Sequence, residues 1–338
     1  MGCAGRPAYP PAPVGKRKKK RKPSKAVDYA LYLALRVVST TLHCFPLESA
    51  MRLAQFLGDM LYRLDKRHRL RSMENLRASF PEKSDAELRK LTRDSFRLFP
   101  LLGVEVMLTP RYVKLERLAQ HFVLGNLGEA MRLLVERQQG VILVTGHYGN
   151  WEVLGYMLAV MGFESTNVAR PLDNPYVNAY VLGVREKKGQ RIIDKTGALR
   201  EAPEVMERAG ALGFTADQDA GPKGMFVDYF GRPASTYKSI GVLAMRYEVP
   251  VVGGCARRLG YDFRFRLDVQ HIIYPRDWRD ERDPLRYITQ RYTRAIEDAV
   301  RGEPGQYLWL HRRWKTRPKG EDPAAADAAV RPAGGSVP

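Results

Sequence analysis

The sequence predicts an α/β fold with a mostly parallel central sheet. Between residues 120 and 258, short apolar runs of strand length alternate with segments of helical periodicity. Parallel strands need long crossover connections, which are usually helices, so this alternation indicates βαβ units. The chain has 338 residues and 44% of them are hydrophobic, so it can bury a substantial core as one large domain or two smaller ones.

Periodicity places the individual elements. Ser84 followed by Glu87 three residues later forms a capping box, which predicts a helix start at that point. We expect strands at 141–145, 165–169, 190–193, 211–216, 225–230, 250–257 and 262–272. We expect helices at 69–79, 84–107, 127–138, 150–161, 174–188, 198–209, 237–247 and 284–302.

The N-terminal part divides into a basic tail and an apolar segment. Residues 1–25 begin rich in Pro, Gly and Ala and become strongly basic from Lys16 to Lys25, which predicts a disordered tail. Residues 26–66 are apolar at helical spacing, and a basic run before an apolar helix is typical of a membrane anchor at the cytoplasmic face. Asp28 and Arg36 interrupt the first apolar part, so whether 27–47 spans or lies on the membrane is left open.

The remaining domain boundaries follow from composition. Residues 67–317 contain the predicted sheet and are expected to form the main folded domain, whereas residues 318–338, dominated by Ala, Pro and Gly, are expected to be disordered. No small-residue cleavage site follows the apolar segment, so a secretory signal is not expected. Arg6 stands where N-myristoylation prefers Ser or Thr, so that modification is not expected either.

Charge and cysteine content limit the partners. The formal net charge of +19 predicts a polyanionic partner, such as nucleic acid, anionic lipid headgroups or an acidic protein. Cys3, Cys44 and Cys255 have no paired spacing, so neither a disulfide framework nor a zinc site is indicated. A reducing location that faces the cytosol fits this pattern best.

The run Gly-His-Tyr-Gly-Asn-Trp-Glu at 146–152 contains the strongest candidate site. It joins an apolar strand to a helix for which Asn150 is a suitable N-cap. Residues five apart in one helix would point roughly 140° away from each other, so His147 and Glu152 can meet only if His147 lies in the turn before the helix. A histidine backed by a carboxylate can take a proton from a hydroxyl. A capping or surface histidine is the alternative when the pair is considered alone.

Further candidate residues follow other strands. Arg170 could hold a phosphate or an acyl carbonyl, or could simply be a surface arginine. The aromatic segment 225–231, which contains Phe226, suits either the lining of an apolar channel or the core. The segment 307–315 mixes aromatic residues with cations, as an interfacial surface would. A polar, glycine-rich loop after the fourth expected strand supplies Asp217, Gln218, Asp219, Lys223 and Gly224.

Four of these segments resemble, in order, the conserved blocks of bacterial lipid A biosynthesis late acyltransferases (lauroyl and myristoyl transferases). The segments are 147–152, 167–175, 217–236 and 306–318, and the first carries the His-x4-Asp/Glu signature of the wider glycerolipid acyltransferase superfamily. The resemblance extends from about residue 27 to 318, and the ending QYLWLHRRWKTRP favours this branch over general phospholipid acyltransferases. It implies a three-layer α/β/α sandwich preceded by an N-terminal helical membrane-associating segment.

The resemblance also implies roles for the site residues. His147 would be the general base and Glu152 its partner, while Arg170, the loop residues from Asp217 to Gly224, and Phe226 would bind substrate. Acyl transfer from a thioester to a hydroxyl needs no metal and no cofactor, because the thioester is itself a co-substrate. A Gly-x-Ser-x-Gly nucleophile elbow is absent from the sequence, which favours direct transfer over an acyl-enzyme.

The partners implied are an acyl thioester on acyl carrier protein or coenzyme A, an anionic lipid A precursor as acceptor, and a membrane surface. The implied location is the bacterial inner membrane, with the catalytic domain facing the cytoplasm. Within the superfamily, the alternative acceptor is a lysophospholipid or a glycolipid.

Two other classes of protein are less consistent with the sequence. A nucleic-acid-binding protein would explain the charge, but the sequence carries no recognisable RNA- or DNA-binding motif. A metal-dependent hydrolase would need more ligands at suitable spacing than His147 and Glu152. The other histidines form no such set: His43, His68, His121, His271 and His311.

Overall fold

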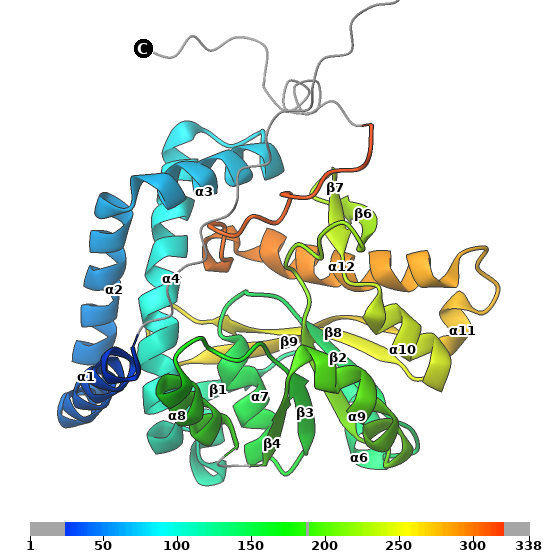
Figure 1. Ribbon diagram of the computed structural model, residues 1–338, viewed down its shortest axis with the longest axis horizontal. Helices are drawn as coiled ribbons and strands as arrows, with labels where there is room; N and C mark the ends of the chain where they lie inside the picture. Colours follow the sequence, from blue (N-terminus) through cyan, green and yellow to red (C-terminus); the bar gives the residue numbers. More distant parts are fainter. Residues whose placement is uncertain (1–23, 187–188, 321–338) are drawn as a thin grey trace, which may run out of the picture.

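A computed structural model of the chain describes residues 24–186 and 189–320, and its centre is a mixed, mostly parallel sheet (Figure 1). The strand order is β1-β9-β8-β2-β5-β3-β4, and all neighbours pair in parallel except β8 and β9, which are consecutive in the chain. The strands are β1 (Phe122–Leu124), β2 (Val141–Thr145), β3 (Ser165–Val168), β4 (Gln190–Ile193), β5 (Ala211–Thr215), β8 (Val251–Arg258) and β9 (Phe265–Ile273). The predicted α/β class with a mostly parallel sheet is therefore confirmed.

Helices cover both faces of this sheet, because successive side chains of a strand point to opposite sides. Ile142 and Val144 of β2 join the core formed with α9, α10 and α12. Val141 and Leu143 of the same strand face the opposite way and pack near α6. The helices concerned are α6 (Gly128–Glu136), α7 (Trp151–Val160), α8 (Pro175–Glu186), α9 (Lys195–Glu207), α10 (Ser239–Tyr247) and α12 (Pro284–Gly302).

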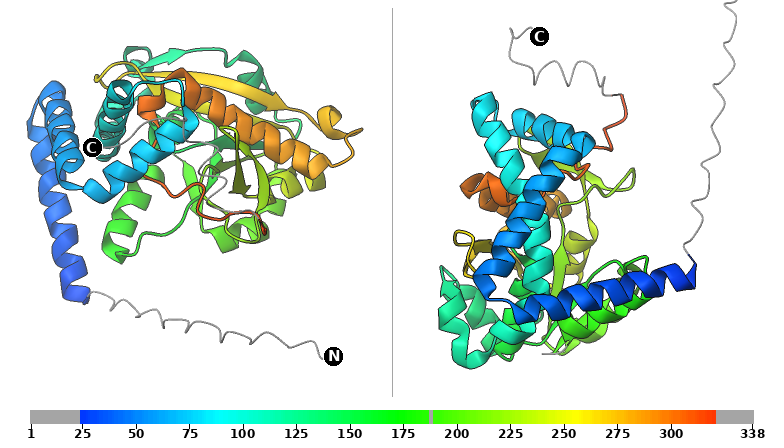
Figure 2. Two further views of the ribbon diagram at one scale, coloured as in Figure 1. Left: turned by 90° about the horizontal axis from the view of Figure 1, so that it is seen from above. Right: turned by 90° about the vertical axis from the view of Figure 1, so that its left-hand side faces the viewer.

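Four long helices precede the sheet in the described chain and lie along one side of the molecule (Figures 1 and 2). They are α1 (Lys25–Cys44), α2 (Leu47–Leu64), α3 (Lys66–Ser79) and α4 (Asp85–Tyr112). The helix α2 packs on α4, and α1 packs on α8. The capping box predicted at Ser84 and Glu87 is present at the start of α4.

Within the described residues, none of these helices combines the length and apolarity that a membrane crossing requires. Several large apolar side chains of α2 are nevertheless exposed at the spacing of one helical face. They are Leu53, Phe56, Leu57, Met60, Leu61 and Leu64. The predicted tails lie mostly outside the described residues, including almost all of the basic run from Lys16 to Lys25.

The structure contains several short elements that the sequence pattern did not predict. The strand β7 (Arg232–Thr236) pairs with β6 (Met225–Tyr229) in a separate two-stranded hairpin. Short segments such as these carry too few residues to show a period. The others are β1, α5 (Leu118–His121), α11 (Pro275–Trp278) and 3-10 turns at Leu115–Arg117 and Pro304–Gln306.

Candidate active site

The turn between β2 and α7 places His147 at the carboxyl edge of the sheet. Gly149 has φ +57°, and a Cβ there would lie 2.0 Å from the carbonyl oxygen of Ala256, so only glycine fits. The next residue, Asn150, caps α7, because its side chain accepts a hydrogen bond from the backbone N–H of Val153 at 2.9 Å. His147 therefore lies in the turn before the helix, as the sequence predicted.

The imidazole of His147 is held by Asp217, which follows β5. Asp217 Oδ1 lies 2.7 Å from His147 Nδ1, and Oδ2 accepts the backbone N–H of His147 at 2.9 Å. The Asp217 side chain is 1% exposed and that of His147 is 17% exposed. A carboxylate can only accept here, so Nδ1 carries the proton and Nε2 keeps its lone pair as an acceptor.

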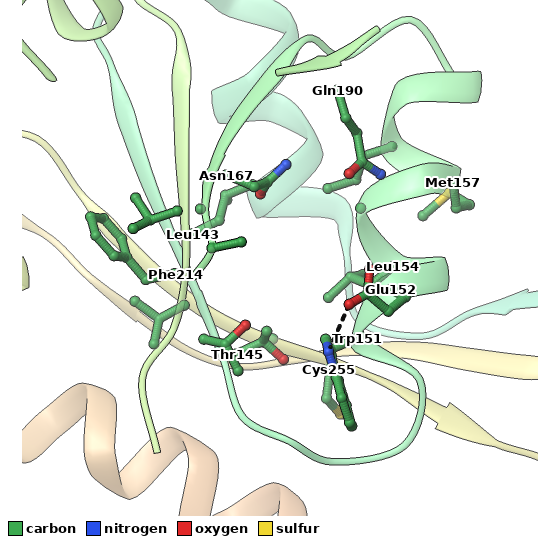
Figure 3. Close-up of a pocket in the computed structure, with 18 of the residues that line it drawn as sticks. Leu143, Thr145, Trp151, Glu152, Leu154, Met157, Asn167, Gln190, Phe214 and Cys255 are labelled. Atoms are coloured by element: carbon green, nitrogen blue, oxygen red, sulfur yellow. Dashed lines mark hydrogen bonds between the residues drawn. The ribbon is translucent and has the colours of Figure 1, made fainter. Parts of the chain in front are cut away.

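Glu152 lies in the first turn of α7 but does not hold the imidazole. Its carboxylate pairs with Arg185 of α8 through two hydrogen bonds of 2.6 and 2.8 Å. It also accepts a hydrogen bond from Trp151 Nε1 at 3.2 Å, which Figure 3 shows as a dashed line. The sequence predicted that Glu152 contacts the His147 ring. That prediction is wrong, because Asp217 makes the contact. The physical reason is that the first turn of α7 faces α8, whereas the carboxyl end of β5 lies directly beside that of β2.

The charges around the ring raise its basicity. Burial lowers the pKa of His147, but the charge and hydrogen bond of Asp217, with a smaller effect from Glu152, outweigh it and leave the pKa above its ordinary value of 6.5. Burial raises the pKa of Asp217, but the same interactions with His147 hold it well below its usual range. Asp217 is therefore ionised at neutral pH.

A second histidine approaches the first. The rings of His147 and His311 have centroids 4.9 Å apart. Burial, together with the charge of His147, lowers the pKa of His311 to about 4. His311 is therefore neutral at physiological pH and adds no positive charge beside the base.

The loop after Asp217 is fixed by the C-terminal segment. The Gln218 side-chain nitrogen lies 3.4 Å from His147 Nε2, on the open side of the ring. Arg313 donates to the backbone oxygen of Gln218 at 3.3 Å, and Asp219 accepts a hydrogen bond of 2.9 Å from the Thr316 hydroxyl. Both contacts fix the loop that carries Asp217 and Gln218 beside the His147 ring.

Much of the C-terminal segment is buried, so the prediction that 307–315 forms an interfacial surface is wrong for most of its residues, although Arg312 and Lys315 are exposed. Tyr307, Trp309 and Arg313 are each 1% exposed. The backbone N–H of Leu308 donates to the carbonyl oxygen of His147 at 3.1 Å, so this segment packs directly on the catalytic turn.

The remaining candidate residues lie in three different surroundings. Arg170 lines the cavity described below, but it is 84% exposed and contacts Asp173 at 3.3 Å. Lys223 is exposed, and a Cβ on Gly224 would lie 2.1 Å from the Ser235 hydroxyl. Phe226 is half-buried in β6 and is not one of the residues that line the cavity. Its neighbours Tyr229 and Phe230 belong to the core.

A cavity of about 610 Å³ opens beside His147 and runs between the sheet and the helices α6 and α7 (Figure 3). This volume lies in the range of pockets that enclose small-molecule ligands. Its walls are mostly apolar and include Leu127, Met131, Leu134, Leu143, Leu154, Leu158, Phe214, Val252 and Val269. In the part of the chain that the structure describes, no three His, Cys, Asp or Glu side chains are grouped to hold a metal ion.

Together, these features define the class of protein. A buried carboxylate orients a histidine that lines an apolar cavity. This arrangement suits an enzyme that activates a hydroxyl next to an apolar substrate.

Comparison with known proteins identifies the family. The chain belongs to the bacterial lipid A biosynthesis acyltransferases, whose family pattern matches residues 15–316. It is 27% identical over 273 residues to the lipid A biosynthesis lauroyltransferase of Escherichia coli K12, covering 80% of this chain and 86% of that protein. It is 26% identical to the palmitoleoyltransferase of the same organism over 276 residues, covering 78% and 84%. It is also 26% identical to the myristoyltransferase over 278 residues, covering 80% and 81%. The chain is therefore an acyltransferase that acylates a hydroxyl, and its family membership supports acyl transfer to lipid A.

Proposed function

We propose that this enzyme transfers a fatty acyl group from a thioester donor directly to a hydroxyl of a lipid A precursor, with His147 as the general base. The observation that carries the proposal is the hydrogen bond of 2.7 Å between His147 and Asp217 at the mouth of the apolar cavity. The bond leaves Nε2 unprotonated, so its lone pair can accept a proton, and the cavity offers a place for the fatty chain.

The reaction follows from this geometry. Nε2 of His147 takes the proton of the acceptor hydroxyl while its oxygen attacks the thioester carbonyl carbon. The tetrahedral intermediate then collapses, the C–S bond breaks, and the imidazolium returns its proton to the leaving thiolate. Asp217 stabilises the imidazolium while it exists. We assign the Gln218 amide, 3.4 Å from Nε2, as a donor to the oxyanion.

Glu152 then has a positioning role. Its paired hydrogen bonds with Arg185 join α7 to α8 beside the cavity, and its charge adds to the field that raises the His147 pKa. Arg170, at the cavity edge, is available to a phosphate or carbonyl of a substrate.

The N-terminal helices support a membrane location for the reaction. The exposed apolar face of α2 defined above is of the kind that inserts into a headgroup layer. A net charge of +19 would attract both an anionic leaflet and the acidic acyl carrier protein. We therefore place the enzyme on the cytoplasmic side of the bacterial inner membrane, with acyl carrier protein or coenzyme A carrying the acyl group.

The proposal is tested by mass spectrometry of lipid A from a strain that lacks the gene. Lipid A lighter by one acyl group is expected, and a plasmid copy should restore it whereas a His147→Ala copy should not. Unchanged lipid A together with an altered phospholipid or glycolipid would contradict the proposed acceptor.

A further inference from the structure

In the described structure, two side chains in the wall of the apolar cavity carry a buried polar atom without a partner: Thr145, next to the catalytic turn, and Gln190, at the far end. Gln190, the first residue of β4, is 6% exposed and lines the cavity. Its side-chain nitrogen Nε2 has no hydrogen-bond partner among the described residues. Buried amides are almost always paired, so this one requires a separate explanation.

Gln190 is remote from the catalytic base. It pairs with Ser165 at the start of β3, and Ser165 pairs with Ala211 at the start of β5. Because these strands are parallel to β2, their first residues lie at the amino edge of the sheet, whereas His147 follows the carboxyl edge. Figure 3 shows Gln190 at the opposite end of the cavity from Thr145 and Trp151.

The amide also limits the space there. A Cβ on Gly155, one turn into α7, would lie 2.9 Å from Gln190 Nε2, so the amide lies directly against the helix. An acyl chain that reached this end of the cavity would meet the Gln190 amide. The amide could not move away from the chain, because α7 lies directly behind it.

We propose that Gln190 sets the length of the fatty acyl chain that the enzyme accepts. This inference rests on the proposed function and on the acyl chain occupying this cavity. Each methylene buried against apolar walls such as Leu143 and Phe214 strengthens binding about fourfold. A methyl end that reaches the amide covers a donor it cannot satisfy, which weakens binding on the order of tenfold. A methylene that meets the amide therefore loses more than the roughly fourfold that its burial gains, so the preferred chain ends before Gln190.

The test compares acyl donors of increasing even chain length on acyl carrier protein, with a lipid A precursor as acceptor. Gln190→Met removes the amide at nearly constant shape, and Gln190→Leu provides a second apolar replacement. For a donor two carbons longer than the wild-type optimum, we expect kcat/KM to rise about tenfold in both variants. The rate with the wild-type optimal donor should stay within about threefold.

Gln138→Met is the matched control, because it makes the same change at an exposed position outside the cavity. It should keep the wild-type chain-length profile. Thermal melting shows whether the two Gln190 variants are folded. If both are folded and both keep the wild-type chain-length profile, Gln190 does not set the chain length. Failure of the wild-type enzyme to acylate the precursor with any donor would instead overturn the proposed function.

Discussion

At His147, the identity of the carboxylate that holds the ring decides how the site works. The sequence was sufficient to predict the histidine, its turn and the N-cap at Asn150, because these are local features. It did not predict Asp217 as the partner, since that contact depends on β5 lying between β2 and β3. Sequence spacing favoured Glu152 instead. The available signal was that Asp217 follows a strand end in a predicted parallel sheet.

Replacing Asp217 tests this assignment. Asp217→Asn should lower kcat by about 10²–10⁴, because the amide neither fixes the productive tautomer nor stabilises the imidazolium. Glu152→Gln is the comparison variant and should lower kcat less, because Glu152 pairs with Arg185 and does not hold the His147 ring. Steady-state acylation rates measure both. A larger loss in Glu152→Gln than in Asp217→Asn would restore Glu152 as the partner of the base.

The pH profile gives a second check at the same residue. A general base works in its neutral form, and the pKa of His147 is raised. The wild-type rate should therefore fall with decreasing pH through a midpoint above 6.5. Asp217→Asn removes the negative charge that raises this pKa, so its midpoint should move to lower pH. A midpoint that stays in place would show that Asp217 does not control the titration.

At the scale of elements, a buried ion pair anchors the helix that follows the catalytic turn. Glu105 of α4 is fully buried and pairs with Arg258 at the end of β8, with Nε 2.6 Å from Oε1. The same carboxylate accepts from the Asn150 side chain at 2.7 Å. One pair thus links α4, β8 and the cap of α7, so the placement of the site depends on it.

Breaking this pair should destabilise the protein. Arg258→Met leaves the Glu105 charge buried and unpaired, so we expect a loss of about 3–5 kcal/mol in the free energy of unfolding. The double variant Glu105→Leu with Arg258→Met removes both charges and should recover part of that loss. Urea unfolding of the two variants measures the difference in the free energy of unfolding. If Arg258→Met is as stable as the wild-type protein, the role given to the ion pair is wrong.

Long elements were predictable and short ones were not. The period of helices such as α4 and α12 extends over many turns, so apolar spacing located them. The hairpin strand β7 spans five residues and carries no such signal. The mixed composition of 307–315 suggested a surface, but its aromatic residues pack in the core and its Arg313 is buried with its hydrogen-bond partners. The burial of these residues depends on contacts with elements far away in the sequence, so local composition could not predict it.

At the scale of the whole molecule, α2 lies at the outer side of the N-terminal helices (Figures 1 and 2), and its exposed side chains form an apolar face. The double substitution Phe56→Asp with Leu64→Asp places charges on that face, where both side chains are more than half exposed. We expect reduced sedimentation with anionic vesicles and an unchanged melting temperature. Full sedimentation of the variant would show that α2 does not mediate membrane binding.

The most direct measurement is the initial rate of acyl transfer to a lipid A precursor in detergent micelles, compared between the wild-type enzyme and His147→Ala. The rate should fall by at least ~10², while the melting curve shows that the variant is still folded. A folded His147→Ala enzyme that acylates its acceptor at nearly the wild-type rate would contradict the central claim.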